Sequence, residues 1–124
     1  MLQTGGSQTW RAAFVITRQL REDDPMNLSE LTKAMHEFVE GKGWYGPKSP
    51  RPQTARNLAI SLSLEAAEVL EHYQWQAEAR DRDELAGELA DVALYLLQLA
   101  SVCNIDLEQA VLAKLKVNTN RQWE

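Results

Sequence analysis

The sequence predicts an all-α fold in which four helices form a bundle. Apolar residues recur at helical spacing in four segments, these segments open on residues that cap helices, and no segment alternates like a β-strand. The 124 residues, 44% of them hydrophobic, suffice for one domain with a modest core. Association of several copies would enlarge that core.

The first 26 residues differ from the rest of the chain. They contain two adjacent glycines at 5–6, a short candidate helix at 9–20 and a polar run at 21–25, and Met26 then stands as an alternative start. Three interpretations stay open for this segment: an extension, a remnant of expression, or a genuine extra helix. We place the helical domain at residues 27–121 and a short tail at 122–124.

The first helix of the domain is expected from Leu28 to Gly41 or Gly43. Asn27 precedes it as an N-cap, with Glu30 three residues further on. Its apolar face comprises Leu28, Leu31, Met35 and Phe38. The Gly- and Pro-rich residues 43–52 then predict a loop.

Two long helices are expected to follow as antiparallel neighbours. The first runs from Thr54 to about Trp75, and its apolar stripe comprises Leu58, Leu62, Ala66 and Val69. The second runs to about Cys103, after Asp81 and Glu84 in the pattern of a capping box. The polar residues 76–82 between them allow the chain to turn and return alongside itself.

The last helix is expected from Leu107 to about Val117, after a turn at Asn104. Asp106 and Gln109 provide its N-terminal capping pattern. Cys103 is the single cysteine, so no intramolecular disulfide can form, and its apolar surroundings predict a buried structural thiol.

Two pairs of acids stand inside the two long helices, Glu65-x-x-Glu68 in the first and Glu88-x-x-Asp91 in the second. A spacing of three residues places both acids of a pair on one helix face. If the helices face each other, four negative charges converge and repel unless a cation joins them. A lone pair of this kind is more often solvated surface. Two pairs, both flanked by Ala, Leu and Val, favour a metal site.

Oxygen ligands favour Mg²⁺, with Mn²⁺ as a substitute, and the scarcity of His and Cys argues against zinc. Mg²⁺ commonly shares its coordination with substrate phosphates, so the acids suggest phosphoryl chemistry. Lys114, Asn118 and Arg121 share one helical face and could contact phosphates. Cations near a helix C-terminus equally serve the helix dipole.

Four further side chains are candidates for enclosing a nucleobase: Trp44, Trp75 and Tyr95 by stacking, and His36 by a hydrogen bond. Aromatic residues at helical positions are more often core, which is the simpler interpretation of Tyr95. A helical histidine such as His36 is more often a surface residue or a satisfied partner. Trp44 differs because it stands in a loop rich in Gly and Pro.

The net charge of −5 and the pI near 5.1 argue against a surface for polymeric nucleic acid or membrane, because such surfaces cluster Lys and Arg. No apolar run reaches the roughly 18 to 20 residues of a membrane span, and no signal-peptide pattern opens the chain. We therefore expect a cytoplasmic protein without membrane or nucleic-acid polymer partners.

Residues 27–121 resemble the MazG-like family of all-α nucleoside triphosphate pyrophosphohydrolases, whose hallmark is E-x-x-E followed by E-x-x-D. The resemblance is closest to the short branch that includes dCTP pyrophosphatase and the integron-associated MazG-like proteins. Motifs that recur in that branch are read here as His36, Trp44, Arg56-Asn57-Leu58, Gln74-Trp75, Tyr95 and the set Lys114, Asn118 and Arg121.

The resemblance implies Mg²⁺-dependent hydrolysis of a nucleoside triphosphate to the monophosphate and pyrophosphate, as a house-cleaning activity. It implies that the metal ligands are Glu65, Glu68, Glu88 and Asp91, with Glu65 or Glu68 alternatively acting as the catalytic base. It implies that the β- and γ-phosphates contact Lys114, Asn118 and Arg121, and that base and sugar lie among His36, Trp44, Trp75 and Tyr95. A homotetramer built as a dimer of dimers, with sites across subunits, is also implied, and a dimer comes second.

The leading substrate is dCTP or a 5-modified dCTP. Two alternatives stay open. The same reaction could act on dUTP or a non-standard purine triphosphate, or the chain could be a non-catalytic helical interaction module whose acids are merely surface.

Overall fold

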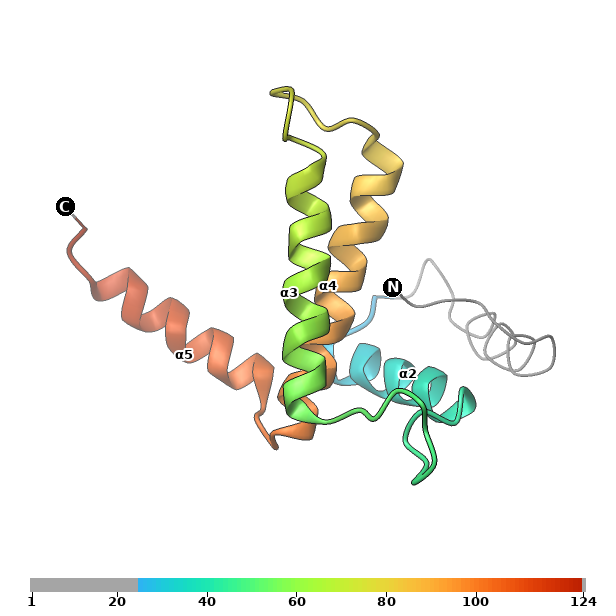
Figure 1. Cartoon of the computed structure of the whole chain (residues 1–124). Coiled ribbons are helices and arrows are strands. Elements are labelled where there is room, and N and C mark those ends of the chain that lie inside the picture. The colour runs from blue at the N-terminus through green and yellow to red at the C-terminus, as the bar shows by residue number, and fades with distance from the viewer. Residues whose placement is uncertain (1–24, 124) are drawn as a thin grey trace.

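The computed structural model describes residues 25–123, and within that range the fold is all-α without strands. The helices are α2 (Leu28–Gly41), α3 (Ala55–Glu71), α4 (Arg82–Val102) and α5 (Leu107–Asn120) (Figure 1). The all-α prediction is confirmed. The candidate helix at residues 9–20 lies outside the described residues.

Each helix begins at a side chain that accepts hydrogen bonds from the first turn. Asn27 accepts from the Glu30 backbone N–H at 2.8 Å, and Thr54 accepts from that of Asn57 at 3.2 Å. Asp81 and Asp106 cap α4 and α5 in the same way. These bonds satisfy donors that a helix start leaves without partners, which fixes the four starting points.

Helices α3 and α4 form an antiparallel hairpin, the tallest part of the molecule, and α2 packs against α4 near the foot of the hairpin (Figure 1). The core lies where these three helices meet. Its buried apolar side chains are Met35, Val39, Leu58, Leu97 and Ala100. Burying a side chain of the size of Leu58 stabilises the fold by roughly 1.5–3 kcal/mol, so this contact region holds the hairpin and α2 together.

Helix α5 contacts the end of α4 and then runs away from the hairpin (Figure 1). Asn104 makes this turn possible with a φ of 55°, in the left-handed region that asparagine tolerates. The expectation of a four-helix bundle is therefore not met within one chain, because α5 diverges from the hairpin after its contact with the end of α4.

Two details of the sequence prediction are wrong. Helix α3 ends at Glu71 rather than near Trp75, because the backbone N–H groups of His72 and Tyr73 bond three residues back and tighten the chain into a turn. Cys103 is exposed rather than buried, because it caps α4 where the chain departs toward α5.

Helix α4 is long and apolar enough to cross a membrane by length and composition alone, with a mean hydropathy of 1.4 over its most apolar window. This differs from the expectation that no apolar run reaches the length of a membrane span. Helix α4 packs between α2 and α3 and carries Glu88 and Asp91. A central helix of a compact fold has the same properties.

Candidate active site

The two acid pairs face each other across the α3–α4 hairpin. Glu65 is almost fully buried, with 1% of its surface exposed, and Glu68, Glu88 and Asp91 are half-buried. Carboxylates are rarely buried unless they are paired or bind a metal. The antiparallel hairpin brings these acids near enough for their charges to affect one another.

The acids affect one another's protonation. Burial raises the pKa of Glu68, and the neighbouring Glu65 raises it further through a hydrogen bond and through its charge. Burial likewise raises the pKa of Asp91, and the charges of Glu65 and Glu88 add to this effect. Like charges at close range disfavour ionisation. The cluster is therefore electrostatically strained when it is fully ionised.

Carboxylate oxygens are the ligands that Mg²⁺ prefers, and Mg²⁺ usually takes only one or two of them while keeping several waters. Among residues 25–123 no three His, Cys, Asp or Glu side chains converge as a preformed metal cage. The acids thus offer oxygen ligands of the kind that Mg²⁺ takes, but among the described residues they do not form a preformed cage.

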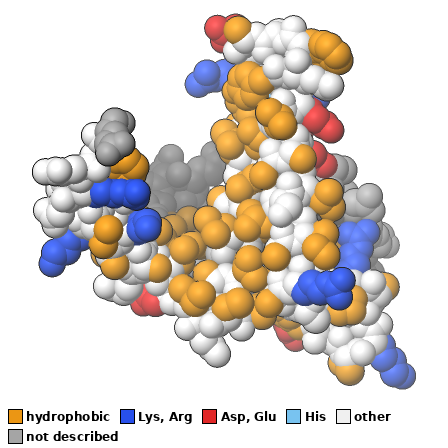
Figure 2. Space-filling model, turned by 60° about the vertical axis from the view of Figure 1, so that its left-hand side comes forward, with side chains coloured by type: hydrophobic (Ala, Val, Ile, Leu, Met, Phe, Trp, Pro, Cys, Tyr) orange, Lys and Arg blue, Asp and Glu red, His pale blue; other side chains and the backbone are white. Residues whose placement is uncertain are grey.

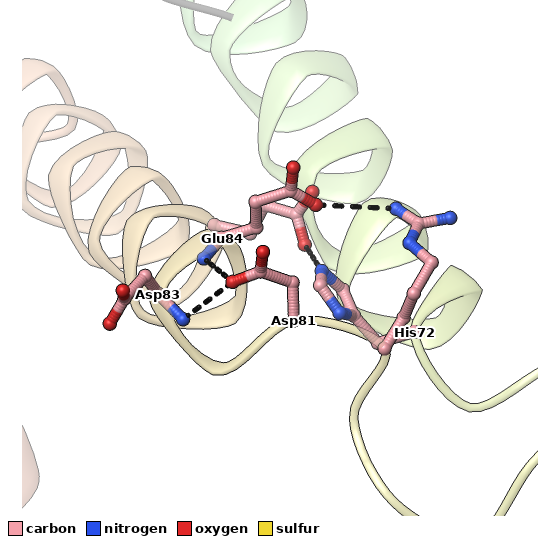
Figure 3. A network of polar contacts seen from close by, with 6 residues as sticks. His72, Asp81, Asp83 and Glu84 are labelled. Carbon is pink, nitrogen blue, oxygen red and sulfur yellow. Dashed lines mark hydrogen bonds and ion pairs between the residues drawn. The ribbon is translucent and has the colours of Figure 1, made fainter.

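A histidine that the sequence analysis missed adjoins this cluster. His72, at the C-terminal cap of α3, is 1% exposed, and its Nε2 lies 2.5 Å from Oε2 of Glu88 on α4. Figure 3 shows the ring reaching across the end of the hairpin. The signal was present in the sequence, because His72 follows Glu65 by seven residues and Glu68 by four, which places all three on one face.

A hollow of about 320 Å³ lies next to the acids, and its lining includes Trp44, Tyr95, Arg51, Gln53, Asn57 and Ser61. Burial and the charge of Glu65 raise the pKa of Tyr95, while a hydrogen bond with Ser61 lowers it. The influence of Glu65 on Tyr95 ties the hollow to the acid cluster. The guanidinium of Arg51 lies 5.5 Å from the centre of the Trp44 ring.

His36 does not line that hollow, but it belongs to a polar network that reaches the hollow at Gln53. Its Nδ1 is 2.6 Å from the Tyr45 hydroxyl, and its Nε2 is 2.7 Å from Oγ of Ser101. The amide of the buried Gln98 donates to the same Tyr45 hydroxyl and, at 2.7 Å, to Oε1 of Gln53. Because both ring nitrogens of His36 have partners, its contact with a substrate would require rearrangement.

The other candidate residues lie further from the acids. Trp75 is 88% exposed beyond the end of α3, and it lines a small hollow together with His72 and Arg80. Lys114 and Arg121 are exposed on and just after α5, which points away from the hairpin, and the guanidinium of Arg121 stacks on Trp123. Asn118 is half-buried on α5. One chain therefore brings Trp44 and Tyr95 to one hollow, which neither Trp75 nor the α5 set lines.

Residues 60–124, which hold both acid pairs and the α5 set, match the MazG-like family. The chain belongs to this family. The chain is 32% identical over 114 residues to dCTP pyrophosphatase 1 of Mus musculus, covering 85% of this chain and 63% of that protein. The Homo sapiens dCTP pyrophosphatase 1 is 33% identical over 103 residues, covering 76% of this chain and 58% of that protein. The MazG-like chain thus spans about three fifths of the length of these curated relatives.

A solved structure supports the MazG-like assignment. A pyrophosphatase from Archaeoglobus fulgidus aligns with a TM-score of 0.63 and 33% identity, covering 80% of this chain and 94% of that one. The all-α fold and the family predicted from the acid pairs are therefore confirmed. The roles of the individual site residues stay predictions.

Proposed function

We propose that this MazG-like protein is a Mg²⁺-dependent nucleoside triphosphate pyrophosphohydrolase, which converts a triphosphate into the monophosphate and pyrophosphate in a cytoplasmic house-cleaning role. The observation that carries the proposal is the pair of facing acid motifs around the buried Glu65, next to a hollow framed by aromatic side chains. The names of the curated relatives and of the solved neighbour support the same reaction class.

The metal would be held by Glu65, Glu68, Glu88 and Asp91. When bound, Mg²⁺ supplies charge stabilisation at the phosphate and lowers the pKa of a bound water. The raised pKa values of Glu68 and Asp91 support this role, because a cation relieves the repulsion that disfavours their ionised forms. Glu65 or Glu68 could instead orient the attacking water as a general base.

The hollow beside Tyr95 is the best place for the base and sugar. Trp44 and Tyr95 offer ring surfaces there, and Gln53, Asn57 and Ser61 offer hydrogen-bond donors and acceptors. We propose dCTP or a modified dCTP as the preferred substrate, with dUTP or a non-standard purine triphosphate as the alternative. A phage relative is named dATP/dGTP diphosphohydrolase and is 46% identical over 39 residues, which supports the purine triphosphates as alternative substrates.

The phosphate contacts from Lys114, Asn118 and Arg121 would come from a second copy of the chain, because α5 runs away from its own acids. Figure 2 shows hydrophobic side chains along the hairpin and onto α5. The large exposed ones include Ile60, Leu64, Leu70, Leu89, Leu96, Val111, Leu112, Leu115 and Val117. An apolar surface of this extent marks an interface. We propose a homotetramer, with a dimer as the second choice.

The test is a panel of ribo- and deoxyribonucleoside triphosphates incubated with the protein and Mg²⁺, with products separated by anion exchange. We expect monophosphate and pyrophosphate, with the highest kcat/KM for dCTP or 5-methyl-dCTP. Release of diphosphate and inorganic phosphate would contradict the proposed bond cleavage. The absence of turnover with every nucleotide would favour the interaction module.

Charge-removing variants locate the activity. Glu68→Gln and Asp91→Asn should each lower kcat/KM by more than about a hundredfold, because both act on the proposed metal site. Glu71→Gln removes an exposed carboxylate from α3, the helix that also carries Glu68. This control variant should keep kcat/KM within about twofold of the wild type. Equal losses in all three variants would point to damage of the fold rather than of a site.

A further inference from the structure

The side-chain amide of Gln53, in the wall of the hollow beside Tyr95, is held in one orientation. Its Nε2 donates to the backbone carbonyl of Arg51 at 2.6 Å, and its Oε1 accepts from Nε2 of Gln98 at 2.7 Å. A backbone carbonyl can only accept, so the nitrogen of Gln53 must face Arg51 and its oxygen must face Gln98. An amide turned over in this place would lose both hydrogen bonds.

Gln98, which supplies one of these bonds, is fixed in its turn. It lies on α4 with 2% of its surface exposed, and its Nε2 also donates to the hydroxyl of Tyr45 at 3.2 Å. That hydroxyl contacts one ring nitrogen of His36 on α2, and the other ring nitrogen contacts Ser101 on α4. Turning the Gln98 amide would leave buried polar groups without these partners, which is unfavourable.

A fixed amide matters because cytosine and uracil differ in the order of their hydrogen-bonding groups. Cytosine has a donor at N4 beside an acceptor at N3, whereas uracil has an acceptor at O4 beside a donor at N3. Gln53 uses one hydrogen and one lone pair within the protein, so one N–H and one lone pair remain for a ligand. A freely turning amide matches either base by turning over, but an amide fixed in one orientation matches only one of them.

We infer that Gln53 is a specificity-determining residue that distinguishes 4-amino from 4-oxo pyrimidines, and that Gln98 is the positioning residue that fixes its amide. The inference rests on the proposed function, since it takes the hollow as the place of the base and dCTP as the preferred substrate. Gln98 does not line the hollow, so it acts through Gln53. A site built around one pattern of donors and acceptors rejects an analogue that leaves its polar groups unpaired.

The test measures how the full-length protein binds the non-hydrolysable α,β-imido analogues of dCTP and dUTP with Mg²⁺, by isothermal titration calorimetry. Gln98→Met keeps the length of the side chain but removes both donors, so the Gln53 amide keeps only its bond to Arg51 and turns over more readily. We expect the preference for the dCTP analogue, taken as a ratio of Kd values, to fall by about fivefold or more. Tighter binding of the dUTP analogue should contribute to this fall, which a general loss of packing would not produce.

A double-mutant cycle tests whether Gln98 acts through Gln53. Gln53→Met removes the amide itself, so it should lower the preference for the dCTP analogue at least as far, and adding Gln98→Met should change it no further. The same fall caused by Gln98→Met with and without the Gln53 amide would overturn the positioning role. Gln109→Met, which removes an exposed amide on α5, is the control and should keep the wild-type preference.

Thermal unfolding shows which variants fold. If Gln98→Met does not, Gln98→Asn takes its place in the cycle, because its amide is shorter by one methylene and withdraws from Oε1 of Gln53. The expected fall in preference for the dCTP analogue is the same for both variants, and an unchanged preference in Gln98→Asn would equally overturn the inference.

The outcomes separate this inference from the proposed function. A wild-type protein that releases pyrophosphate from dCTP, with the same preference in Gln98→Met, would overturn the roles of Gln53 and Gln98 alone. Equal binding of the two analogues by an active wild type would do the same. A wild-type protein that binds neither analogue and hydrolyses no triphosphate would overturn both.

Discussion

Asp91 illustrates how a functional requirement acts against stability at the scale of one residue. Its pKa is raised by burial and by the charges of Glu65 and Glu88, so the folded protein disfavours the ionised form more than the unfolded chain does. A carboxyl group of this kind destabilises the fold at neutral pH, and this destabilisation is lost as the pH falls through the raised folded-state pKa toward the ordinary value of 3.8. Repulsion of this kind is expected among acids that together bind a cation.

Asp91→Asn should therefore raise Tm of the metal-free protein at pH 7.5, or leave it unchanged, while abolishing most of the stabilisation by Mg²⁺. Binding to the native state at ten times Kd stabilises by about 1.4 kcal/mol in the wild type. Differential scanning fluorimetry with and without Mg²⁺ measures both effects. Full Mg²⁺ stabilisation in the variant would remove Asp91 from the proposed ligand set.

His36 should give the opposite pH dependence. Burial lowers its pKa below the ordinary 6.5, so folding favours the neutral ring. The stability that this ring contributes is present above pH 6.5 and is lost as the pH falls below that value and the unfolded chain takes up the proton. Urea unfolding between pH 8 and pH 5 should show the wild type losing its advantage over His36→Gln as the solution is acidified. A pH-independent difference would contradict this.

At the scale of elements, sequence reasoning succeeded where the chemistry is local. The starts of α2, α4 and α5 followed from Asn27, Asp81 and Asp106, because an N-cap bonds within three residues of itself. The end of α3 did not follow, because no Gly or Pro marks it, and its capping residue His72 contacts Glu88 on the other helix of the hairpin. Helix boundaries that depend on tertiary contacts cannot be predicted from the local sequence pattern.

The cap of α4 offers a test of this local control. Asp81 accepts hydrogen bonds from the backbone N–H groups of Asp83 and Glu84, at 2.9 and 3.1 Å (Figure 3). Asp81→Ala should lower the free energy of unfolding by about 1 kcal/mol, because both donors lose their acceptor. Asp83→Ala, an exposed acid of the same first turn, should cost only a few tenths of a kcal/mol. Urea denaturation measures the free energy of unfolding of both variants. Equal losses would show that the side chain of Asp81 does not stabilise the start of α4.

The candidate site shows the same division between local and tertiary information. The acid pairs could be predicted because helical spacing alone puts each pair on one face, and Trp44 stood out because its loop has no core to fill. The engagement of His36 by Tyr45 and Ser101 could not be predicted, since Ser101 lies 65 residues further along the chain. His72 was missed for a related reason. Its partner Glu88 belongs to the other helix, and only the register of the hairpin brings them together.

At the scale of the whole molecule, two features of the described residues support the proposed assembly of several copies. Helix α5 exposes Val111, Leu112, Leu115 and Val117 without a packing surface. Lys114 and Arg121 lie on and just after the same helix, which runs away from the hairpin that carries the acids they were predicted to serve (Figure 1). Docking of α5 on the hairpin of a second copy would bury the apolar residues and deliver Lys114 to a neighbour's acids.

Assembly through α5 predicts a dependence on its apolar face. Leu112→Asp places a charge in the proposed interface, which leaves an uncompensated ion if it is buried. Size-exclusion chromatography with light scattering should show the wild type as a tetramer or dimer and the variant shifted to smaller species. Glu108→Asp, a conservative change at an exposed first-turn acid, should keep the wild-type mass. A monomeric wild type would contradict the assembly itself.

Sites shared between subunits predict complementation between two inactive variants. Glu68→Gln removes an acid and Lys114→Ala removes a cation, and each homo-oligomer should be nearly inactive. Mixed under conditions that exchange subunits, they form hybrid pairs in which one site receives its acids from the Lys114→Ala chain and its lysine from the Glu68→Gln chain. Random pairing restores about a quarter of wild-type activity. Activity that stays at the level of the separate variants, with exchange confirmed by native mass spectrometry, would show that each chain supplies its own phosphate contacts.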